Sequence, residues 1–470
     1  MAEKRQFLRQ PYSAYHAKPV PQEDVELTHV ERGSAGGEYL RRFWQPVAMS
    51  SELGDLPLVV RIFGEDLVLF RTTAGEVGLL EKHCPHRGTS LEFGIANECG
   101  LRCCYHGWLF APDGTILETP GDPPESTLRQ RLMHGAYPAR EYKGLIFGYF
   151  GPPEAIPPFP VYDTYDVPGD ELVPYSIHYP CNWLQVHENV MDPVHTTFLH
   201  HRVSFAQFQA DVWGELPVME FFETPAGMVY VSTRRWQDKV WVRTNDILLP
   251  NIGQIGHLFE DGQEEKAFNA VAITRWTIPV DNTNCRIIGW RHFLPETDPR
   301  GIADRDGVGK EKVDFYGQTK HRSYEQMQRE PGDYEAQVSQ RPIAVHAMEH
   351  LTECDRGVTM LRRMLRREIR KVAKGEAPYV PTPRLAGGAV TATYAHDSVV
   401  AVPPLPDPTE DRELLRRVGR AITAIVARGP HQAAEDRKDR IRAMIARLPQ
   451  ELAPDAAPYT AALAEPSQLP

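Results

Sequence analysis

Two short cysteine–histidine pairs constrain the fold of this 470-residue chain more than any other feature. The first pair, Cys84 and His86, lies in CPHRG, and the second, Cys103 and His106, lies in CYHGW. Zinc sites usually pair cysteine with cysteine and histidine with histidine. Mixed pairs suit a 2Fe–2S cluster in which one iron takes two thiolates and the other takes two imidazoles. We therefore expect two loops that face one shared metal group, with zinc and coincidence as the alternatives.

The residues around these pairs fit such loops. Gly88 and Gly107 mark the tight turns that bring two loops over one cluster. Cys104 directly follows Cys103, but only Cys103 keeps the Cys-x-x-His spacing. We expect Cys104 to pack as a small apolar residue, and Cys99 to be structural in the same way.

Composition narrows the class of protein. The chain is 41% hydrophobic and 24% charged, which is ordinary for soluble globular proteins, and its length favours several domains. The net charge of −11 does not indicate a basic surface of the kind that binds nucleic acid or anionic lipid. Neither a secretory signal nor an apolar run of the roughly 18 residues needed to cross a membrane is visible. Seven cysteines, some at metal-site spacing, fit a reducing compartment, so we expect a cytoplasmic protein.

Two proline-rich segments divide the chain, because proline interrupts both helices and sheets. They are GPPEAIPPFP at 151–160 and VPPLPDP at 402–408. Alternating apolar runs before the first break predict strands, including a hairpin around Gly64. For the two amphipathic helices after the second break, packing against the preceding domain is the main interpretation and a partner-docking tail the alternative. The predicted organisation is an N-terminal arm (1–39), an all-β domain (40–155), a mixed domain (156–400) with helices near 182–201 and 335–374, and a helical extension with a tail (401–470).

A second group of metal-binding side chains lies in CNWLQVHENVMDPVHTTFLHH, residues 181–201. A non-haem iron site needs two histidines and one carboxylate, with positions left open for O₂ and substrate. Asp192 and His195 are three residues apart and share a helix face. His195 and His200 are five apart, so they converge only if the helix bends or bulges, and Pro193 already disturbs it. Surface histidines near a helix end are the alternative on spacing alone.

Together these motifs resemble the Rieske non-haem iron aromatic-ring-hydroxylating oxygenases, specifically the oxygenase (alpha) subunits of the phthalate dioxygenase-like and aryl ether O-demethylase-like groups. CPHRG and CYHGW match the Rieske signature, and Asn189, Asp192, His195 and His200 match the motif Asn-x-x-Asp-x-x-His-x₄-His. The resemblance extends from residue 25 to about 375. It implies an α+β protein, with an N-terminal all-β Rieske domain, a helix-grip-type catalytic α+β domain and a C-terminal helical extension.

The resemblance also assigns metal ligands and catalytic residues. His195 and His200 would bind a mononuclear Fe(II), whereas His201 lacks the matching spacing. Asn189 and Asp192 would be catalytic residues. The Rieske cluster would be held by Cys84, His86, Cys103 and His106.

In this family a third iron ligand is an aspartate at the start of a downstream helix. Asp355 in EHLTECDRGVTMLRRMLRREI fits that position, with Glu349 and Glu353 as alternatives. Asp355 also lies beside an apparent apolar stripe, and a carboxylate that faces a core is costly unless it is paired or metal-bound. A helix-start aspartate favoured by the dipole is the other interpretation. The stripe consists of Leu351, Cys354, Val358, Leu361 and Leu365.

The resemblance implies a multicomponent reaction in aromatic-compound catabolism. Electrons would come from a separate NAD(P)H-dependent flavin and iron–sulfur reductase, since this chain has no Gly-rich dinucleotide fingerprint. Asp192 would connect a neighbouring subunit's Rieske histidine to His195, which demands a head-to-tail ring, and members of this type are homotrimers. The iron would then activate O₂ beside an aromatic small-molecule substrate. The runner-up interpretation is a Rieske-type electron-transfer protein without oxygenase chemistry of its own.

The sequence does not separate cis-dihydroxylation of a ring from O- or N-demethylation. A carboxylated substrate is expected, because phthalate-type relatives bind carboxylates with arginine, whose guanidinium matches a carboxylate bidentately. The candidates in TRRWQDKVWVR are Arg235 and Arg243, which share one side if the segment is a single unbroken strand, with Arg234 on the other side. Placement at the surface is the alternative for each.

Overall fold

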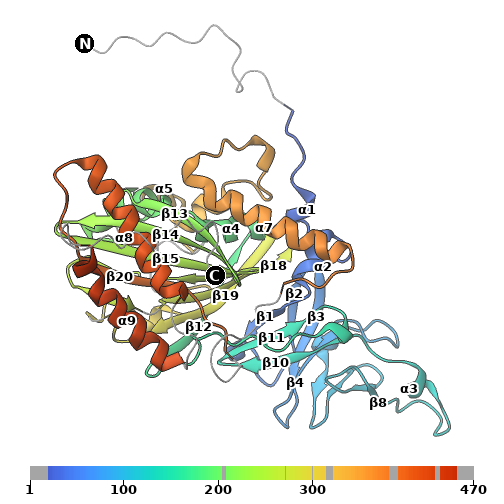
Figure 1. Cartoon of the computed structure of the whole chain (residues 1–470). Coiled ribbons are helices and arrows are strands. Elements are labelled where there is room, and N and C mark those ends of the chain that lie inside the picture. Colours follow the sequence, from blue (N-terminus) through green and yellow to red (C-terminus); the bar gives the residue numbers. More distant parts are fainter. Residues whose placement is uncertain are drawn as a thin grey trace.

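The computed structural model of the chain describes residues 19–203, 208–269, 271–298, 300–313, 321–379, 390–428 and 434–452. It consists of an N-terminal β unit and a larger α+β unit that follow one another along the chain (Figure 1). The predicted domain boundaries remain predictions. The start of the predicted N-terminal arm and most of the predicted tail lie outside the described residues.

Three small antiparallel sheets form the N-terminal unit. The predicted hairpin is confirmed, and it turns at Phe63 and Gly64, which both have positive φ. The third sheet carries the second cysteine–histidine pair, directly after one of its strands. The sheets contain β1 (Trp44–Met49), β11 (Leu145–Tyr149) and β10 (Ala139–Tyr142); β2 (Leu58–Ile62), β3 (Glu65–Arg71), β4 (Val77–Glu81) and β9 (Ala136–Tyr137); and β5 (Ile95–Ala96), β6 (Leu101–Arg102), β7 (Leu109–Phe110) and β8 (Ile116–Glu118).

A single nine-stranded antiparallel sheet organises the second unit. Its main path runs β12–β19–β18–β16–β15–β14–β13, and β20 pairs with β15 and β17. The strands are β12 (Glu171–Tyr179), β13 (Val218–Thr224), β14 (Gly227–Trp236), β15 (Lys239–Leu248), β16 (Ile252–Ile255), β17 (Lys266–Asn269), β18 (Ile273–Asp281), β19 (Asn284–Phe293) and β20 (His396–Ala401).

This sheet has an apolar core on each face, because side chains alternate along a strand. On β14, Met228 and Tyr230 belong to one core, whereas Val229 and Val231 belong to the other. The first core includes residues of α4 (Trp183–Glu188) and α7 (Arg356–Ala373). The second includes residues of α8 (Pro408–Arg428) and α9 (Ala434–Glu451), which lie side by side across the sheet in Figure 1. The two C-terminal helices therefore pack against the catalytic sheet, as the main interpretation of the sequence predicted.

The helices before and between these elements are short. They are α1 (Val25–Thr28), α2 (Ala35–Leu40), α3 (Leu128–Arg131), α5 (Tyr324–Arg329) and α6 (Asp333–Val338). Within the described ranges, no helix is both long and apolar enough to span a membrane.

The predicted continuous helix over 182–201 is wrong. After α4 the chain forms a 3₁₀ turn, η4 (Asn189–Met191), and then leaves the helix at Asp192, whose backbone is extended. Asp192 precedes Pro193, and the residue before a proline is disfavoured in the helical region. The helix predicted near 335–374 is also divided, into α6 and α7 with irregular chain between them.

A buried ion pair fixes α9 to the chain before β12. Arg437 Nη1 donates to Asp163 Oδ2 at 2.9 Å, and neither side chain is more than 4% exposed. Asp163 Oδ1 also accepts hydrogen bonds from the backbone N–H of Thr393 at 3.1 Å and from its hydroxyl at 2.6 Å. The ion pair and its partners thus hold the C-terminal extension, the segment before β20 and the segment before β12 together.

Replacing Arg437 with methionine should lower the free energy of unfolding by about 3–5 kcal/mol, because it leaves the Asp163 carboxylate buried without its cation. Chemical denaturation followed by circular dichroism measures this loss. Arg440→Met provides a matched control on the exposed side of the same helix and should stay within about 0.5 kcal/mol of the parent. Equal losses in both variants would contradict a specific role for the buried pair.

Candidate active site and metal centres

The two cysteine–histidine loops have nearly the same backbone shape. The N–H of Gly88 donates to Cys84 O at 2.9 Å, and the N–H of Gly107 donates to Cys103 O at 3.1 Å. Both glycines have φ of 74°, a conformation that favours glycine over residues with a side chain. The sequence therefore builds the same turn twice.

The side chains of these loops form an inner pair and an outer pair. Cys84 and Cys103 are each 3% exposed. Burial raises the pKa of the Cys84 thiol to about 11, and the neighbouring Cys103 thiol also contributes. The His86 and His106 rings lie nearer the surface, with centroids 4.4 Å apart. Two buried sulfurs and two outer imidazoles are the donor set that a 2Fe–2S cluster with one thiolate-bound and one imidazole-bound iron requires.

The expectation for the neighbouring cysteines is wrong. Cys104 and Cys99 are both exposed, so neither packs as a small apolar residue. The turn of the second loop directs Cys103 inward, and the next side chain along the chain faces solvent.

The second metal-binding group joins residues that are distant in sequence. His195, His200 and Asp333 each offer one ligand atom, and these atoms lie within 4.8 Å of one another. Asp333 Oδ1 is 3.4 Å from His200 Nε2 and 3.7 Å from His195 Nε2.

A π-helix brings the two histidines together. Residues Thr196–Val203 form this helix, η5, directly after His195. A π-helix bonds residues five apart, so it has a wider turn than an α-helix. The rings of His195 and His200 are consequently 5.0 Å apart, centroid to centroid. The expectation that these histidines converge only through a bulge is confirmed, and His201 instead directs Nδ1 to Phe208 O at 2.7 Å.

The structure does not bring Asp355 to the histidines, which corrects its assignment as the third ligand. The Asp355 carboxylate accepts hydrogen bonds from the backbone N–H of Thr352 at 2.7 Å and from its hydroxyl at 3.1 Å. The predicted apolar stripe fails at the same point, because α7 begins at Arg356 and Leu351 is 45% exposed. Asp333, which sequence reasoning missed, takes the place beside the histidines. It too is a helix-start aspartate, at the first position of α6.

Asp192 lies between His195 and the surface. Its Oδ2 is 3.3 Å from His195 Nδ1, and its side chain is 32% exposed. The opposite ring nitrogen, Nε2, is 3.2 Å from Asn189 Nδ2, which also donates to Asp333 Oδ1 at 3.3 Å. Both nitrogens of His195 thus have a polar neighbour, and one of these neighbours is accessible from outside the protein.

Electrostatics keep both carboxylates of the site ionised. Burial acts to raise the pKa of Asp333, but His200, His195 and Arg275 outweigh it, and the pKa falls well below its usual value. For Asp192, burial likewise opposes ionisation, and His195 together with two backbone N–H groups lowers the pKa. Burial lowers the pKa of His195, yet Asp192 and Asp333 raise it above the ordinary value.

The predicted substrate arginines divide between the two faces of the sheet. Residues 227–248 form the hairpin β14–β15, not one strand, and Ser232 pairs with Arg243 while Arg234 pairs with Trp241. Arg234 and Arg243 therefore share the face of the metal group, whereas Arg235 lies on the opposite face and binds Asp411 of α8. The assignment of Arg235 as a substrate residue is wrong, because the turn reverses the strand between Arg235 and Arg243.

A cavity of about 50 Å³ adjoins the histidine–aspartate group. Arg243 lines it but is already engaged, since it donates to His257 O and lies over the ring of Trp213, 4.8 Å from its centroid. Arg275 on β18 also lines it, and sequence reasoning missed this residue because its strand carries no motif. Within the described ranges the Arg275 side chain makes no hydrogen bond or ion pair, and its buried Nε has no partner. Tyr230, Asn245 and Phe208 complete this part of the lining.

Both groups fit the metals that their donors imply. Two imidazoles and one carboxylate within reach of one ion, with a cavity on the open side, match the ligand set of non-haem Fe(II) enzymes. When bound, such an iron supplies the site for O₂ activation. His195, His200 and Asp333 would hold it, while Asp192 contacts His195 and Asn189 lies between His195 and Asp333.

Comparison with known proteins agrees with both sites. The Rieske [2Fe-2S] domain family matches residues 43–134. The chain is 41% identical over 435 residues to the tert-butanol monooxygenase / tert-amyl alcohol desaturase oxygenase subunit of Aquincola tertiaricarbonis, covering 88% of this chain and 91% of that protein. It is 38% identical over 387 residues to the phenoxybenzoate dioxygenase subunit alpha of Ectopseudomonas oleovorans, covering 78% of this chain and 89% of that protein.

A solved structure shows the same fold. Dicamba monooxygenase bound to dicamba superposes with a TM-score of 0.56 at 20% identity, over 72% of this chain and 99% of that one. The sequence matches to oxygenase subunits extend over most of the chain, and a second metal-binding group accompanies the Rieske domain. These findings exclude the alternative of a protein that only transfers electrons. The chain therefore belongs to the Rieske non-haem iron oxygenases, as the terminal oxygenase subunit of a multicomponent system, with a Rieske 2Fe–2S cluster and a mononuclear iron as its cofactors.

Proposed function

We propose that this oxygenase hydroxylates a carboxylated aromatic substrate, and that Arg275 binds the carboxylate. The observation that carries the proposal is the guanidinium of Arg275 in the wall of the metal-site cavity, whose buried Nε has no hydrogen-bond partner among the described residues. Arg275 interacts with Asp333 only through its charge. A buried donor that makes no hydrogen bond is costly, so the site gains when an anion arrives to accept from it. Arg243 also lines the cavity and adds positive charge to it, although its guanidinium already donates to His257 O.

The charge of the iron-loaded site favours the same substrate class. A divalent ion together with Arg275 and Arg243 outweighs the two negative charges of Asp333 and Asp192, so the cavity attracts an anion. The names of several relatives agree, since they act on phenoxybenzoate, phthalate and 3-chlorobenzoate. O₂, two electrons and two protons convert such a substrate either to a cis-diol or, through hydroxylation of a methoxy carbon, to a phenol, formaldehyde and water.

A second candidate substrate is a tertiary alcohol. A relative with 41% identity is named for tert-butanol and tert-amyl alcohol, and a cavity of about 50 Å³ suits a compact molecule. A tertiary alcohol carries no negative charge that could pair with Arg275.

The proposal extends to the metal ligands, the electron source and the assembly. Cys84, Cys103, His86 and His106 hold the cluster, while His195, His200 and Asp333 hold the iron. A separate NAD(P)H-dependent reductase reduces the cluster in the cytoplasm. In Figure 1, β8 of the cluster-bearing sheet lies far from α4 of the iron site, which favours electron transfer between subunits. The partly exposed Asp192 carboxylate is suited to receive a cluster histidine from a neighbour in a head-to-tail homotrimer.

A paired substrate panel tests the substrate class. Methoxy- and phenoxybenzoates, their methyl esters and tert-butanol are supplied with a surrogate reductase, and product formed per O₂ consumed is measured. We expect coupled turnover of the acids, with esters at least tenfold poorer. Arg275→Gln should raise the KM of the acids about 10–100-fold and leave the esters unchanged, since a hydrogen bond to a charged group contributes roughly 1.5–3 kcal/mol. Equal use of acid and ester overturns the proposal, and coupled turnover of tert-butanol alone supports the second candidate.

A further inference from the structure

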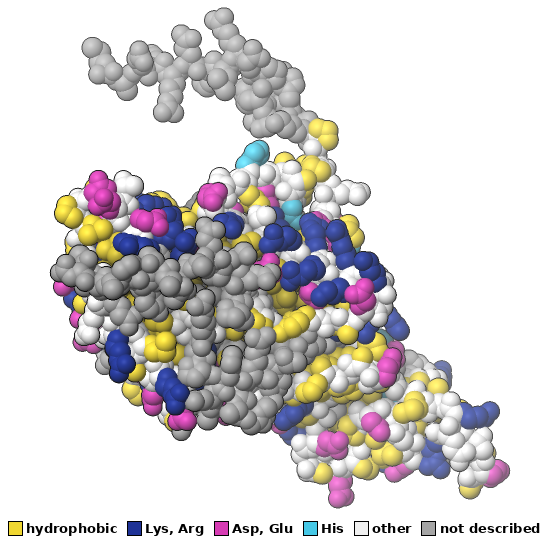
Figure 2. Space-filling view, viewed as in Figure 1, with side chains coloured by type: hydrophobic (Ala, Val, Ile, Leu, Met, Phe, Trp, Pro, Cys, Tyr) yellow, Lys and Arg dark blue, Asp and Glu magenta, His cyan; other side chains and the backbone are white. Residues whose placement is uncertain are grey.

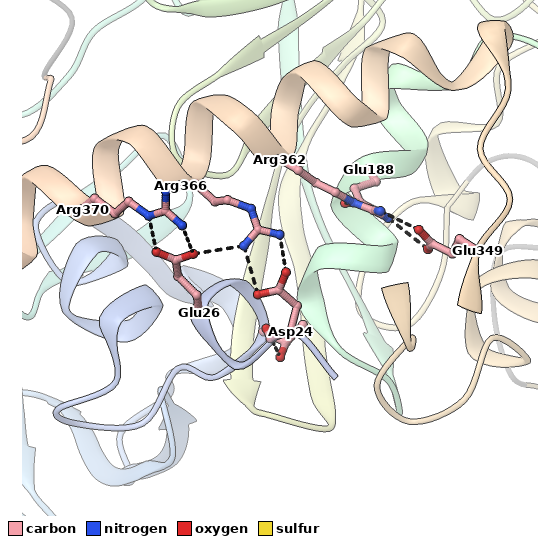
Figure 3. Close-up of polar contacts among 8 residues, drawn as sticks. Asp24, Glu26, Glu188, Glu349, Arg362, Arg366 and Arg370 are labelled. Atoms are coloured by element: carbon pink, nitrogen blue, oxygen red, sulfur yellow. Dashed lines mark hydrogen bonds and ion pairs between the residues drawn. The ribbon is translucent and has the colours of Figure 1, made fainter. Parts of the chain in front are cut away.

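One face of α7 carries an arginine every four residues, at 362, 366 and 370. Figure 3 shows these side chains in a row, each directed at carboxylates from other parts of the chain. Arg366 donates to Glu26 at 3.0 Å, and Arg370 donates to Glu26 at 2.7 Å. Figure 2 shows dark blue and magenta side chains mixed on the surface over α7. The row therefore makes contacts within the chain.

Arg362 differs from Arg366 and Arg370 in the carboxylates that it binds. Its Nη2 donates to Glu188 Oε2 at 2.7 Å and to Glu349 Oε1 at 3.0 Å, and Nε and Nη1 make a second bond to each carboxylate. Its side chain is 11% exposed and that of Glu188 is 9% exposed. Buried bidentate pairs of this kind fix both distance and angle. Arg362 thus connects α7 to the last residue of α4.

Glu188 is directly followed by the residues that surround His195. Asn189, the next residue, lies 3.2 Å from His195 Nε2 and donates to Asp333 Oδ1 at 3.3 Å. The same 3₁₀ turn ends at Asp192. At Gly357, α7 approaches this turn so closely that an added Cβ would lie 2.7 Å from Met191 O. A shift of Glu188 would therefore move Asn189 and Asp192 relative to the metal ligands.

We propose that Arg362 is a positioning residue for the oxygenase reaction: through Glu188 it holds Asn189 and Asp192 in place beside the iron site. The inference rests on the proposed role of Asp192 in electron transfer. We expect Arg362→Met to fold, because Leu361, Met364 and Leu365 anchor α7 with at most 1% exposure, but with a lower free energy of unfolding, because Glu188 loses its buried cation. The expected defect is one of local geometry in a folded protein.

The matched variants are Arg362→Met and Arg370→Met, which remove arginines from the same face of one helix. Only the first contacts α4. In single-turnover reactions with reduced protein, substrate and O₂, we expect Arg362→Met to slow cluster reoxidation at least tenfold and to lower product per O₂ at least threefold, with full iron content. Arg370→Met should stay within twofold of the parent, and Arg362→Lys should recover part of the loss because it keeps the charge.

Amide hydrogen exchange of the metal-free protein gives a readout that does not depend on activity. Exchange over residues 183–195 should be at least tenfold faster in Arg362→Met and unchanged in Arg370→Met. If Arg362→Met does not fold, Glu188→Gln replaces it with the same expectations. Parent-like exchange and reoxidation in the variant overturn the proposal, as does an equal defect in Arg370→Met. Fast reoxidation in Asp192→Asn would overturn the electron-bridge role instead, and the exchange measurement separates the two failures.

Discussion

Replacing Asp333 with alanine should remove the mononuclear iron and all product while leaving the visible absorption of the cluster intact. His195 and His200 would remain, but two imidazoles without the carboxylate lack one of the three ligands on which this type of site depends. Iron per chain should fall from about three to about two, as expected when one mononuclear iron is lost and a two-iron cluster is retained. Metal analysis and the absorption spectrum of the same sample measure both quantities.

Asp355→Ala is the matched control, since it removes a helix-start aspartate whose carboxylate bonds only to Thr352 in the part of the chain that the structure describes. It should keep all three irons and at least half of the parent's turnover. Loss of iron from Asp355→Ala together with its retention in Asp333→Ala would restore the original assignment from sequence.

Asp192→Asn should lower product formation by two or more orders of magnitude at unchanged iron content. The side chain keeps its shape, but an amide presents one acceptor oxygen where the carboxylate presents two. The amide also lacks the negative charge, and its NH2 group replaces one of the two oxygens that would accept from the Nδ1–H of His195 and from a neighbour's imidazole. The reductase should still reduce the cluster, and rapid-mixing spectroscopy should show that reoxidation by O₂ in the presence of substrate is slow.

The variant Asp192→Glu tests the effect of the negative charge separately from the effect of side-chain length. It restores the second acceptor oxygen with one more methylene, so partial recovery of the reoxidation rate is expected. Reoxidation as fast in Asp192→Asn as in the parent would exclude this carboxylate as the electron path, and with it the main support for a head-to-tail ring.

Local spacing was sufficient to predict the turns of the two cysteine–histidine loops and the approach of His195 to His200. The glycine after each cysteine–histidine pair dictates the turn, and the five-residue separation of His195 and His200 required the bulge that the π-helix supplies. In each case the interacting residues lie close together in the sequence, so the backbone between them determines the geometry.

The third ligand and the substrate arginines could not be predicted in the same way. Asp333 and Asp355 both begin helical segments, and only tertiary packing places the first beside the histidines. The turn between β14 and β15 reverses the chain between Arg235 and Arg243, which places them on opposite faces of the sheet. Arg275 has no local signal, because its place in the cavity wall depends on distant elements that form the rest of that cavity.

The π-helix after His195 makes the iron site sensitive to chain length more than to composition. We expect exposed side chains such as Phe198 to tolerate substitution while the five-residue interval remains. Deleting one residue between the histidines would allow an ordinary α-helix, in which each residue turns the chain by about 100° and four residues make roughly one turn. During divergence from a common ancestor, this segment can therefore accept many substitutions, whereas an insertion or deletion within it would have to be compensated elsewhere before oxygen chemistry could continue.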